Sequence, residues 1–141
     1  SDLARLSLFG GISIAHSRTG LIHTLSVAFA QFCKTPHGML NARLLPFAIR
    51  HSLQSYDGLL RRVVEAACGQ SLNSDQEAFD LLVSWLHGII GTDFPLPPAQ
   101  VARNKEALIA RLIQDKGLPL VCHGDVSETG LNRLIEEMIH A

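Results

Sequence analysis

Two histidines, His23 and His37, lie fourteen positions apart in an apolar stretch that favours helix. In one straight helix the two imidazoles would stand about 21 Å apart, at about 1.5 Å per residue, which is too far to share an ion. The segment "KTP" (34–36) offers a turn between them, because Pro36 disfavours helix before it and suits the first turn of a helix after it. Two neutral imidazoles brought together by this turn could each bind a metal ion at about 2.0–2.1 Å.

The other histidines fit more ordinary roles, since a single helical histidine is usually structural or partly exposed. The run "CHGD" (122–125) joins a thiol, an imidazole and a carboxylate, but adjacent residues of a turn rarely converge on one ion. A cap on the last helix, from Asp125 or Ser127, is the preferred interpretation there. His16 either lines a cleft or is structural, and the structural role is favoured. No role is assigned to His51, and no pattern marks a nucleophile with a paired base.

The elements that must position the two histidines are predicted to be helices, so the expected fold class is an all-α, multi-helix bundle. Apolar residues recur at helical spacing in seven segments, at about residues 3–15, 21–32, 37–51, 56–68, 75–90, 101–114 and 127–139. Asp75 is expected to cap the fifth helix. Gly69 and Gly91 are expected to end the fourth and fifth.

A few features interrupt the helical pattern. Pro46 should kink or restart the third helix, because a proline inside a helix removes one hydrogen bond. The segment "DFPLPP" (93–98) is expected to be a stiff connector, and "LPLVC" (118–122) has the look of a strand. The aromatic residues Phe79 and Trp85 are expected to lie in the core.

Composition excludes several functional classes. The 141 residues are 47% hydrophobic and 18% charged, which is enough for one compact domain, 1–141, with its own core. A net charge of −1 without a Lys/Arg run argues against nucleic acid as a partner. No apolar run approaches the roughly 20 residues that span a bilayer. The cysteines Cys33, Cys68 and Cys122 are odd in number and far apart, which favours reduced thiols and a cytoplasmic location.

The segment 20–46 resembles the signature of the iron-containing (group III) alcohol dehydrogenases, a metal-dependent, NAD(P)-linked family. In that family a Gly-x-x-His is followed after fourteen residues by the histidine of a Pro-His-Gly, and then by small and apolar residues and a Leu-Pro. The residues that match in order and spacing are Gly20, His23, Pro36, His37, Gly38, Asn41, Ala42, Leu45 and Pro46. The resemblance extends more weakly over the whole chain, since the family ends in a helical domain whose last helix follows a short extended segment.

The resemblance implies a divalent metal, commonly iron or zinc, bound by one aspartate and three histidines in a cleft between two domains. His23 and His37 match the last two of these ligands. The metal would polarise the oxygen of a small alcohol or aldehyde, while hydride passes between the carbon and NAD or NADP. Imidazole and carboxylate ligands suit several ions, so the sequence leaves the identity of the metal open.

The sequence departs from the family pattern in two respects. The nucleotide-binding domain and the first metal ligands, an aspartate and a histidine four residues later, belong to the family's sequence upstream of this chain. No Asp-x-x-x-His precedes Gly20, and no glycine-rich phosphate loop occurs, so residues that bind the nucleotide cannot be assigned. Val27 stands where many members have a further histidine near the substrate, so no catalytic residue is assigned.

Two functions follow from this pattern. The chain is either the C-terminal metal-binding part of an NAD(P)-dependent alcohol dehydrogenase or aldehyde reductase, inactive in isolation, or an autonomous, non-catalytic helical domain that serves oligomerisation or interaction. Two histidines alone should bind a metal weakly, because each missing ligand removes a preorganised bond. A helical domain without the missing N-terminal domain would expose apolar surface, which favours a homodimer.

Overall fold

The computed structural model describes residues 4, 8, 20–91 and 98–140, and within these ranges the chain is helical and has no strand. Only residues 4 and 8 of the predicted helix 3–15, and residue 98 of the predicted connector 93–98, are described, and His16 lies outside the described residues. The helices are α2 (Leu21–Ala30), α3 (His37–Ser52), the 3-10 helix η1 (Leu53–Ser55), α4 (Leu59–Cys68), α5 (Asp75–Ile90), α6 (Pro98–Arg103), α7 (Lys105–Gln114), α8 (Leu118–Val121) and α9 (Glu128–His140). The predicted all-α fold is confirmed.

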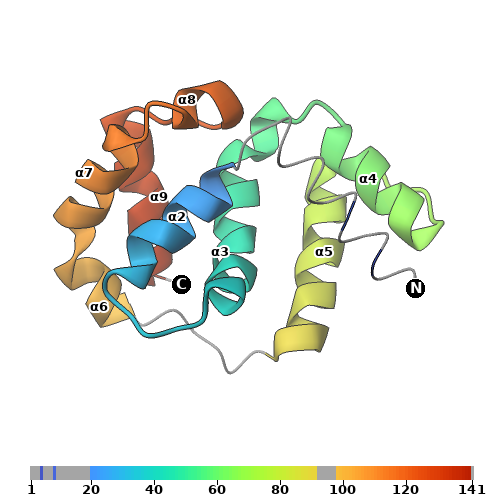
Figure 1. Cartoon of the computed structure of the whole chain (residues 1–141). Coiled ribbons are helices and arrows are strands. Elements are labelled where there is room, and N and C mark those ends of the chain that lie inside the picture. Colours follow the sequence, from blue (N-terminus) through green and yellow to red (C-terminus); the bar gives the residue numbers. More distant parts are fainter. Residues whose placement is uncertain (1–3, 5–7, 9–19, 92–97, 141) are drawn as a thin grey trace.

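Helix α3 lies in the middle of the molecule. Figure 1 shows α2, α6, α7 and α9 on one side of α3, and α4 and α5 on the other side. We call α2, α3 and α6–α9 the main bundle, and α4 with α5 the α4–α5 pair. The main bundle contains one continuous hydrophobic core, and no described residue of α4 or α5 belongs to it. The α4–α5 pair is joined to the bundle through the packing of α5 on α3.

The main bundle is held together by apolar side chains that recur at helical spacing on each of its helices. Leu25, Leu44, Leu112 and Leu134 are fully buried, and burying a leucine contributes about 1.5–3 kcal/mol. On α2 the buried residues are Leu21, Leu25, Ser26, Ala28 and Phe29. The opposite side of α2 is therefore the one on which functional residues can reach solvent or a ligand.

The start of α5 is capped by a different residue from the predicted one, whereas its end is as predicted. Ser74, and not Asp75, caps α5, because its side chain accepts a hydrogen bond from the Glu77 N–H at 3.1 Å. The Asp75 carboxylate instead accepts hydrogen bonds from the N–H groups of Gly58 and Arg61, both at 2.7 Å, and so caps the start of α4. The predicted glycine ends are confirmed, since Gly69 and Gly91 have φ angles of 70° and 75°.

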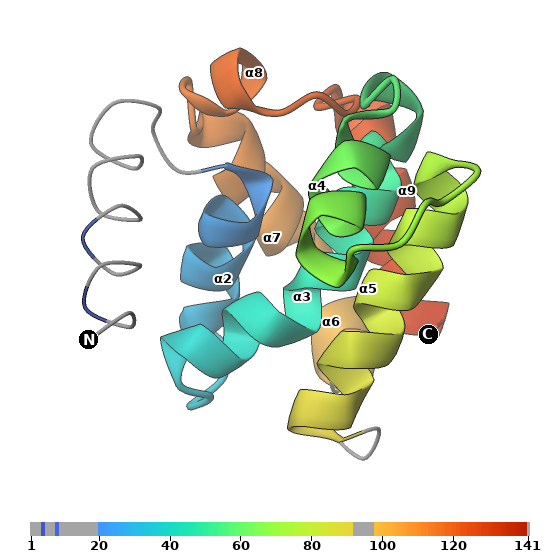
Figure 2. The same ribbon diagram turned by 90° about the vertical axis from the view of Figure 1, so that its right-hand side faces the viewer.

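Three further expectations can be compared with the structure. The predicted strand 118–122 is wrong: residues 118–121 form α8, because Pro119 suits the first turn of a helix and the Cys122 N–H closes that turn on Leu118 O. Of the two alternatives for Pro46, the structure has a kink and not a restart: α3 continues past Pro46 to Ser52, and Figure 2 shows the helix bent. The predicted helix 101–114 is two helices, separated at Asn104, whose φ and ψ are −108° and 12°.

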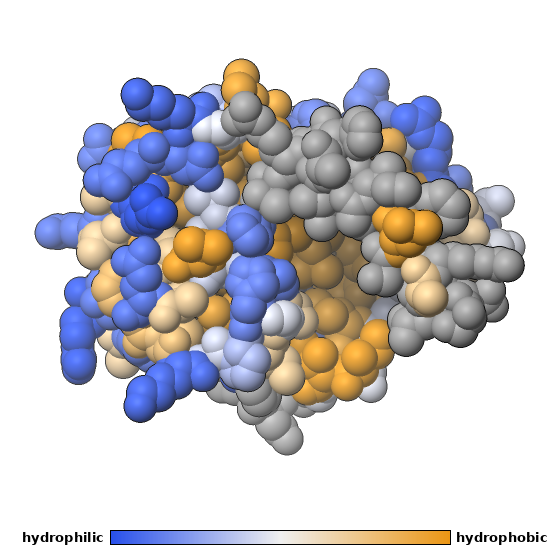
Figure 3. Space-filling view, in the orientation of Figure 1, coloured by the Kyte–Doolittle hydropathy of each residue, from blue (hydrophilic) through white to orange (hydrophobic). Residues whose placement is uncertain are grey.

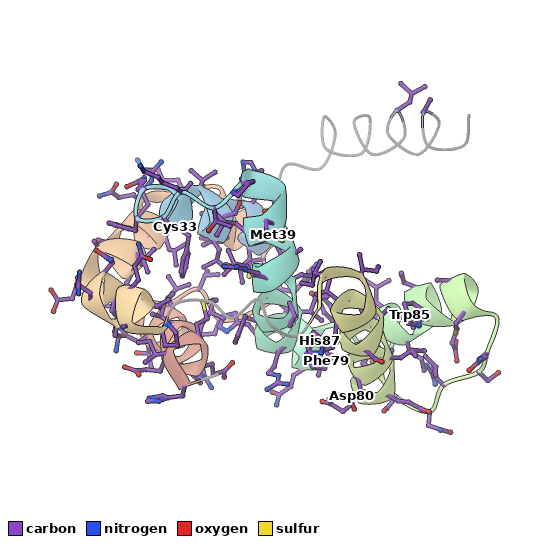
Figure 4. All side chains as sticks on the ribbon, turned by 90° about the horizontal axis from the view of Figure 1, so that it is seen from below. Cys33, Met39, Phe79, Asp80, Trp85 and His87 are labelled. Carbon is purple, nitrogen blue, oxygen red and sulfur yellow. The ribbon has the colours of Figure 1, made fainter. Side chains whose placement is uncertain are left out.

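The two aromatic residues of α5 differ in burial. Phe79 is 2% exposed and packs against α3, where the Arg50 guanidinium lies 5.1 Å from the ring centre. Trp85 is 36% exposed, so its predicted place in the core is wrong. Figure 4 shows Phe79 on the α3 side of α5 and Trp85 on the α4 side.

The three cysteines are free thiols and are partly buried. Cys33 and Cys122 pack against the core of the main bundle. No helix in the described part of the chain has the length and apolar character needed to cross a membrane.

Candidate metal centre

The chain between α2 and α3 reverses direction and brings the two histidines together. After α2 ends, the N–H groups of Phe32 and Cys33 bond to the carbonyl oxygen of Phe29. Pro36, with ψ of 141°, then acts as the N-cap of α3, so His37 is the first residue of that helix. The ring centres of His23 and His37 lie 5.2 Å apart. The predicted turn at 34–36 is therefore confirmed.

The spacing of the two rings fits a shared metal ion. Two imidazoles bound to one ion at about 2.1 Å and about 110° would have their ring centres roughly 5.3 Å apart. The observed separation of 5.2 Å, with 78° between the ring planes, matches this value. Edge-to-face packing of the two rings gives a similar separation without an ion. The hydrogen-bond partners of the ring nitrogens therefore decide whether these atoms are left for a metal ion.

One of the four ring nitrogens of the pair, Nδ1 of His37, has a hydrogen-bond partner within the described ranges. Ser26, which is fully buried, places its hydroxyl oxygen 3.2 Å from Nδ1 of His37 and donates a hydrogen bond to the carbonyl oxygen of His23 at 2.9 Å. Within the described ranges, no residue hydrogen-bonds to Nε2 of His37 or to either ring nitrogen of His23. His23 is partly buried and His37 is exposed. Both rings can therefore reach an ion that sits outside the bundle.

An open groove with a volume of about 610 Å³ adjoins His23. His23, Thr24 and Val27 line it from α2, and α7 with the loop before α8 supplies the other wall. The loop is fixed to α2, because Asp115 accepts hydrogen bonds from the Thr24 hydroxyl and from the Gly117 N–H, both at 2.9 Å. The groove leaves room for a small substrate or for another protein segment beside His23.

The segment "CHGD" (122–125) makes structural contacts with the end of α3 and with α9. Nε2 of His51 donates a hydrogen bond to the backbone carbonyl of Asp125 at 2.8 Å, which ties the end of α3 to this segment. Gly124 is required there, since a Cβ at this position would lie 2.5 Å from the His51 ring. Ser127 caps α9 by accepting a hydrogen bond from the Gly130 N–H at 3.2 Å, so the predicted capping role is confirmed.

The described residues offer two of the four expected metal ligands. No group of three or more His, Cys, Asp or Glu residues gathers within the described ranges. At Gly38 an added Cβ would meet no described atom within 4 Å, so no contact in the described part of the chain requires a glycine there. Ser26 and Asp115 were not singled out from the sequence. Ser26 lies three residues after His23, on neighbouring positions of one helix, but its contact with His37 depends on the fold.

Comparison with known proteins agrees with the pattern of the histidine pair. The family model described as the C-terminal part of the Fe-containing alcohol dehydrogenases matches residues 2–128, a range that includes both histidines and α2–α8. Searches of curated proteins and of solved structures gave no match. The chain therefore belongs to the iron-containing alcohol dehydrogenase family and corresponds to its C-terminal helical domain.

Proposed function

We propose that this chain supplies His23 and His37 to the metal site of a cytoplasmic, NAD(P)-dependent alcohol dehydrogenase or aldehyde reductase that acts on a small alcohol or aldehyde. The observation that supports this most directly is the 5.2 Å separation of the two rings. Membership of the iron-containing family supports the same assignment. A bound divalent cation, iron or zinc, would act as a Lewis acid on the substrate oxygen.

In this proposal the residues of this chain bind the metal ion and orient the substrate, and residues of another domain complete the metal site. His23 and His37 are two imidazole ligands on adjoining helices, and the groove beside His23 receives the substrate. Val27, four residues after His23 and 37% exposed in this groove, is apolar and cannot move a proton. An aspartate and a histidine of a nucleotide-binding domain would complete the coordination sphere, and that domain would hold the nicotinamide that exchanges hydride. The chain alone is expected to bind metal weakly and to lack activity.

Anaerobic calorimetry with Zn²⁺ and Fe²⁺ tests this proposal. Binding of one ion per wild-type chain, lost in the double variant His23→Ala, His37→Ala, is the expected result. The matched control is His87→Ala, His140→Ala, which removes two exposed imidazoles from α5 and α9 and should keep the binding. Absence of binding by the wild-type chain, or equal binding by all three proteins, would contradict the proposal.

A second candidate function is self-association through the α4–α5 pair. Two apolar residues four positions apart are exposed on each helix, which places each couple on one helical face. They are Leu59 (44% exposed) and Val63 (59%) on α4, and Trp85 (36%) and Ile89 (81%) on α5. Figure 3 shows hydrophobic surface over α5 in the hollowed centre of this face of the molecule. Exposed apolar surface of this kind favours association with a second copy.

Sedimentation velocity tests the second candidate. The wild-type chain should sediment as a dimer, and Val63→Lys, Ile89→Lys should convert it to a monomer. The matched control is Ile113→Lys, which changes an apolar residue of the main bundle that is 50% exposed, and it should leave the dimer intact. A monomeric wild-type chain at high concentration would exclude this role.

A further inference from the structure

We infer that Ser26 is a positioning residue of the metal site: its buried hydroxyl holds His37 in the tautomer that carries the ring proton on Nδ1. In that tautomer, the lone pair of Nε2 is free to bind a metal ion. The consequence for metal binding rests on the proposed function above. The tautomer itself is a property of the metal-free chain and can be measured separately.

The hydroxyl of Ser26 has two neighbours that cannot both accept its proton. The carbonyl oxygen of His23 lies 2.9 Å from the serine oxygen, and Nδ1 of His37 lies 3.2 Å from it. A serine hydroxyl carries one proton and two lone pairs, whereas a backbone carbonyl can only accept. If the proton points to His23, the serine oxygen must accept a hydrogen bond from an N–H at Nδ1 of His37.

The reverse arrangement would have the hydroxyl donate to Nδ1 of His37, with the ring proton on Nε2. Two observations disfavour it. The contact to the His23 carbonyl is the shorter of the two, and it is the bond to a preceding-turn carbonyl that serine commonly makes inside a helix. Ser26 is 0% exposed, so water does not compete for its hydroxyl. The arrangement with the proton on Nδ1 gives a hydrogen-bond partner to the Ser26 hydroxyl, to the His23 carbonyl and to Nδ1 of His37.

One hydroxyl therefore links the two candidate ligands. It contacts the backbone of His23 on α2 and the ring of His37 at the start of α3, and so fixes both the orientation and the tautomer of the second imidazole. Groups that hold metal-binding histidines in this way typically account for about 10–100-fold in metal affinity. Without Ser26 the ring of His37 can place its proton on either nitrogen, and only one of these forms leaves Nε2 free.

Proton–nitrogen correlation spectra of the histidine rings test the tautomer in the metal-free chain, under alkaline conditions where imidazoles are neutral. The wild-type chain should show His37 protonated at Nδ1, and Ser26→Ala should show a mixture of tautomers. The matched control is Ser52→Ala, because Ser52 is the other serine that is buried among the described residues, at 4% exposed, and it contacts Cys122 and not the histidine pair. A wild-type His37 protonated at Nε2, or an unchanged tautomer in Ser26→Ala, would overturn the inference.

Zinc calorimetry on the same three proteins tests the consequence for binding. Ser26→Ala should bind Zn²⁺ about 10–100-fold more weakly than the wild-type chain, and Ser52→Ala should bind as the wild type does. If the wild type binds through its two histidines and Ser26→Ala binds equally well, the inference fails while the proposed function stands. If the wild type binds no zinc, the proposed function fails, and the role of Ser26 in positioning a metal ligand fails with it. The spectra alone then decide whether Ser26 sets the tautomer of His37.

Discussion

The two sides of α3 are stabilised in different ways. The main bundle has a continuous, leucine-rich hydrophobic core, and the histidine pair lies on the surface of this bundle. The α4–α5 pair buries few residues, among them Val64, Ala78 and Phe79, and its shape depends on hydrogen bonds at helix ends. The comparison indicates that the region that holds the candidate site is preorganised by burial, whereas the α4–α5 pair is held by directional contacts and should open more easily.

The largest expected effect comes from the core directly beneath the site. Leu25 is 0% exposed and lies on α2 between His23 and Ser26. Leu25→Ala should lower the free energy of unfolding by about 2–5 kcal/mol, because it leaves a cavity in the main bundle. Urea denaturation measures this loss. Leu120→Ala, at a position 74% exposed on α8 of the same bundle, is the control and should change stability by less than about 0.5 kcal/mol. Equal losses would show that burial in the core does not stabilise the main bundle as described.

The next largest effect on stability is expected at the hydrogen bonds that join α4 to α5. Asp75→Ala removes the acceptor of the Gly58 and Arg61 N–H groups and should cost about 1.5–3 kcal/mol, because the acceptor is charged. Amide hydrogen exchange should speed up in α4 while exchange in α2 stays unchanged. Asp75→Asn, which keeps one acceptor oxygen, should give a smaller loss. Faster exchange in α2 would contradict the separation of the two regions.

A smaller effect is expected at the cap of α5. Ser74→Ala leaves the Glu77 N–H without its partner and should cost about 1 kcal/mol. Thermal unfolding followed by circular dichroism measures this loss of stability. Ser74→Asp should lose much less, because aspartate also caps helices well. A stability unchanged by Ser74→Ala would mean that Asp75, as predicted from the sequence, supplies the cap.

The smallest effect is a pH dependence at the start of α9. Hydrogen bonds from the side chain and then the backbone of Ser127 lower the pKa of Asp125 below its ordinary value of 3.8. Because the folded-state pKa is lowered, the stabilising contribution is present above the unfolded value and is lost as the pH falls through the folded one. Asp125→Asn should therefore slightly lower the urea midpoint at neutral pH and have no effect in strongly acidic solution. A difference between the urea midpoints of the two proteins that persists in acid would rule out the lowered pKa of Asp125 as its cause.

Much of the fold could be predicted from the sequence, because the apolar periodicity is local. The bounds of α5, 75–90, and the turn before His37 follow from glycine, proline and spacing. Errors arose where two residues compete for one role, as Ser74 and Asp75 do, or where a short apolar run such as 118–122 suits either a helix or a strand. The exposure of Trp85 depends on which helices cover α5, which no local pattern reveals.

The candidate site was predictable in part for the same reason. His23 and His37 could be paired because Pro36 marks a turn between them. Ser26 and Asp115 could not be found, since their partners lie on other elements, 11 and 91 positions away along the chain. Residues that position a ligand through contacts between helices become visible only once those helices are placed.

The most direct test of the central claim is a zinc titration of the wild-type chain followed by the ring nitrogen signals of all its histidines. We expect the signals of His23 and His37 to shift together and to reach saturation at one ion per chain, while those of His51, which is bonded to Asp125, stay in place. Shifts at only one of the two histidines, or equal shifts at all histidines, would contradict the claim that the turn between α2 and α3 builds half of a metal site.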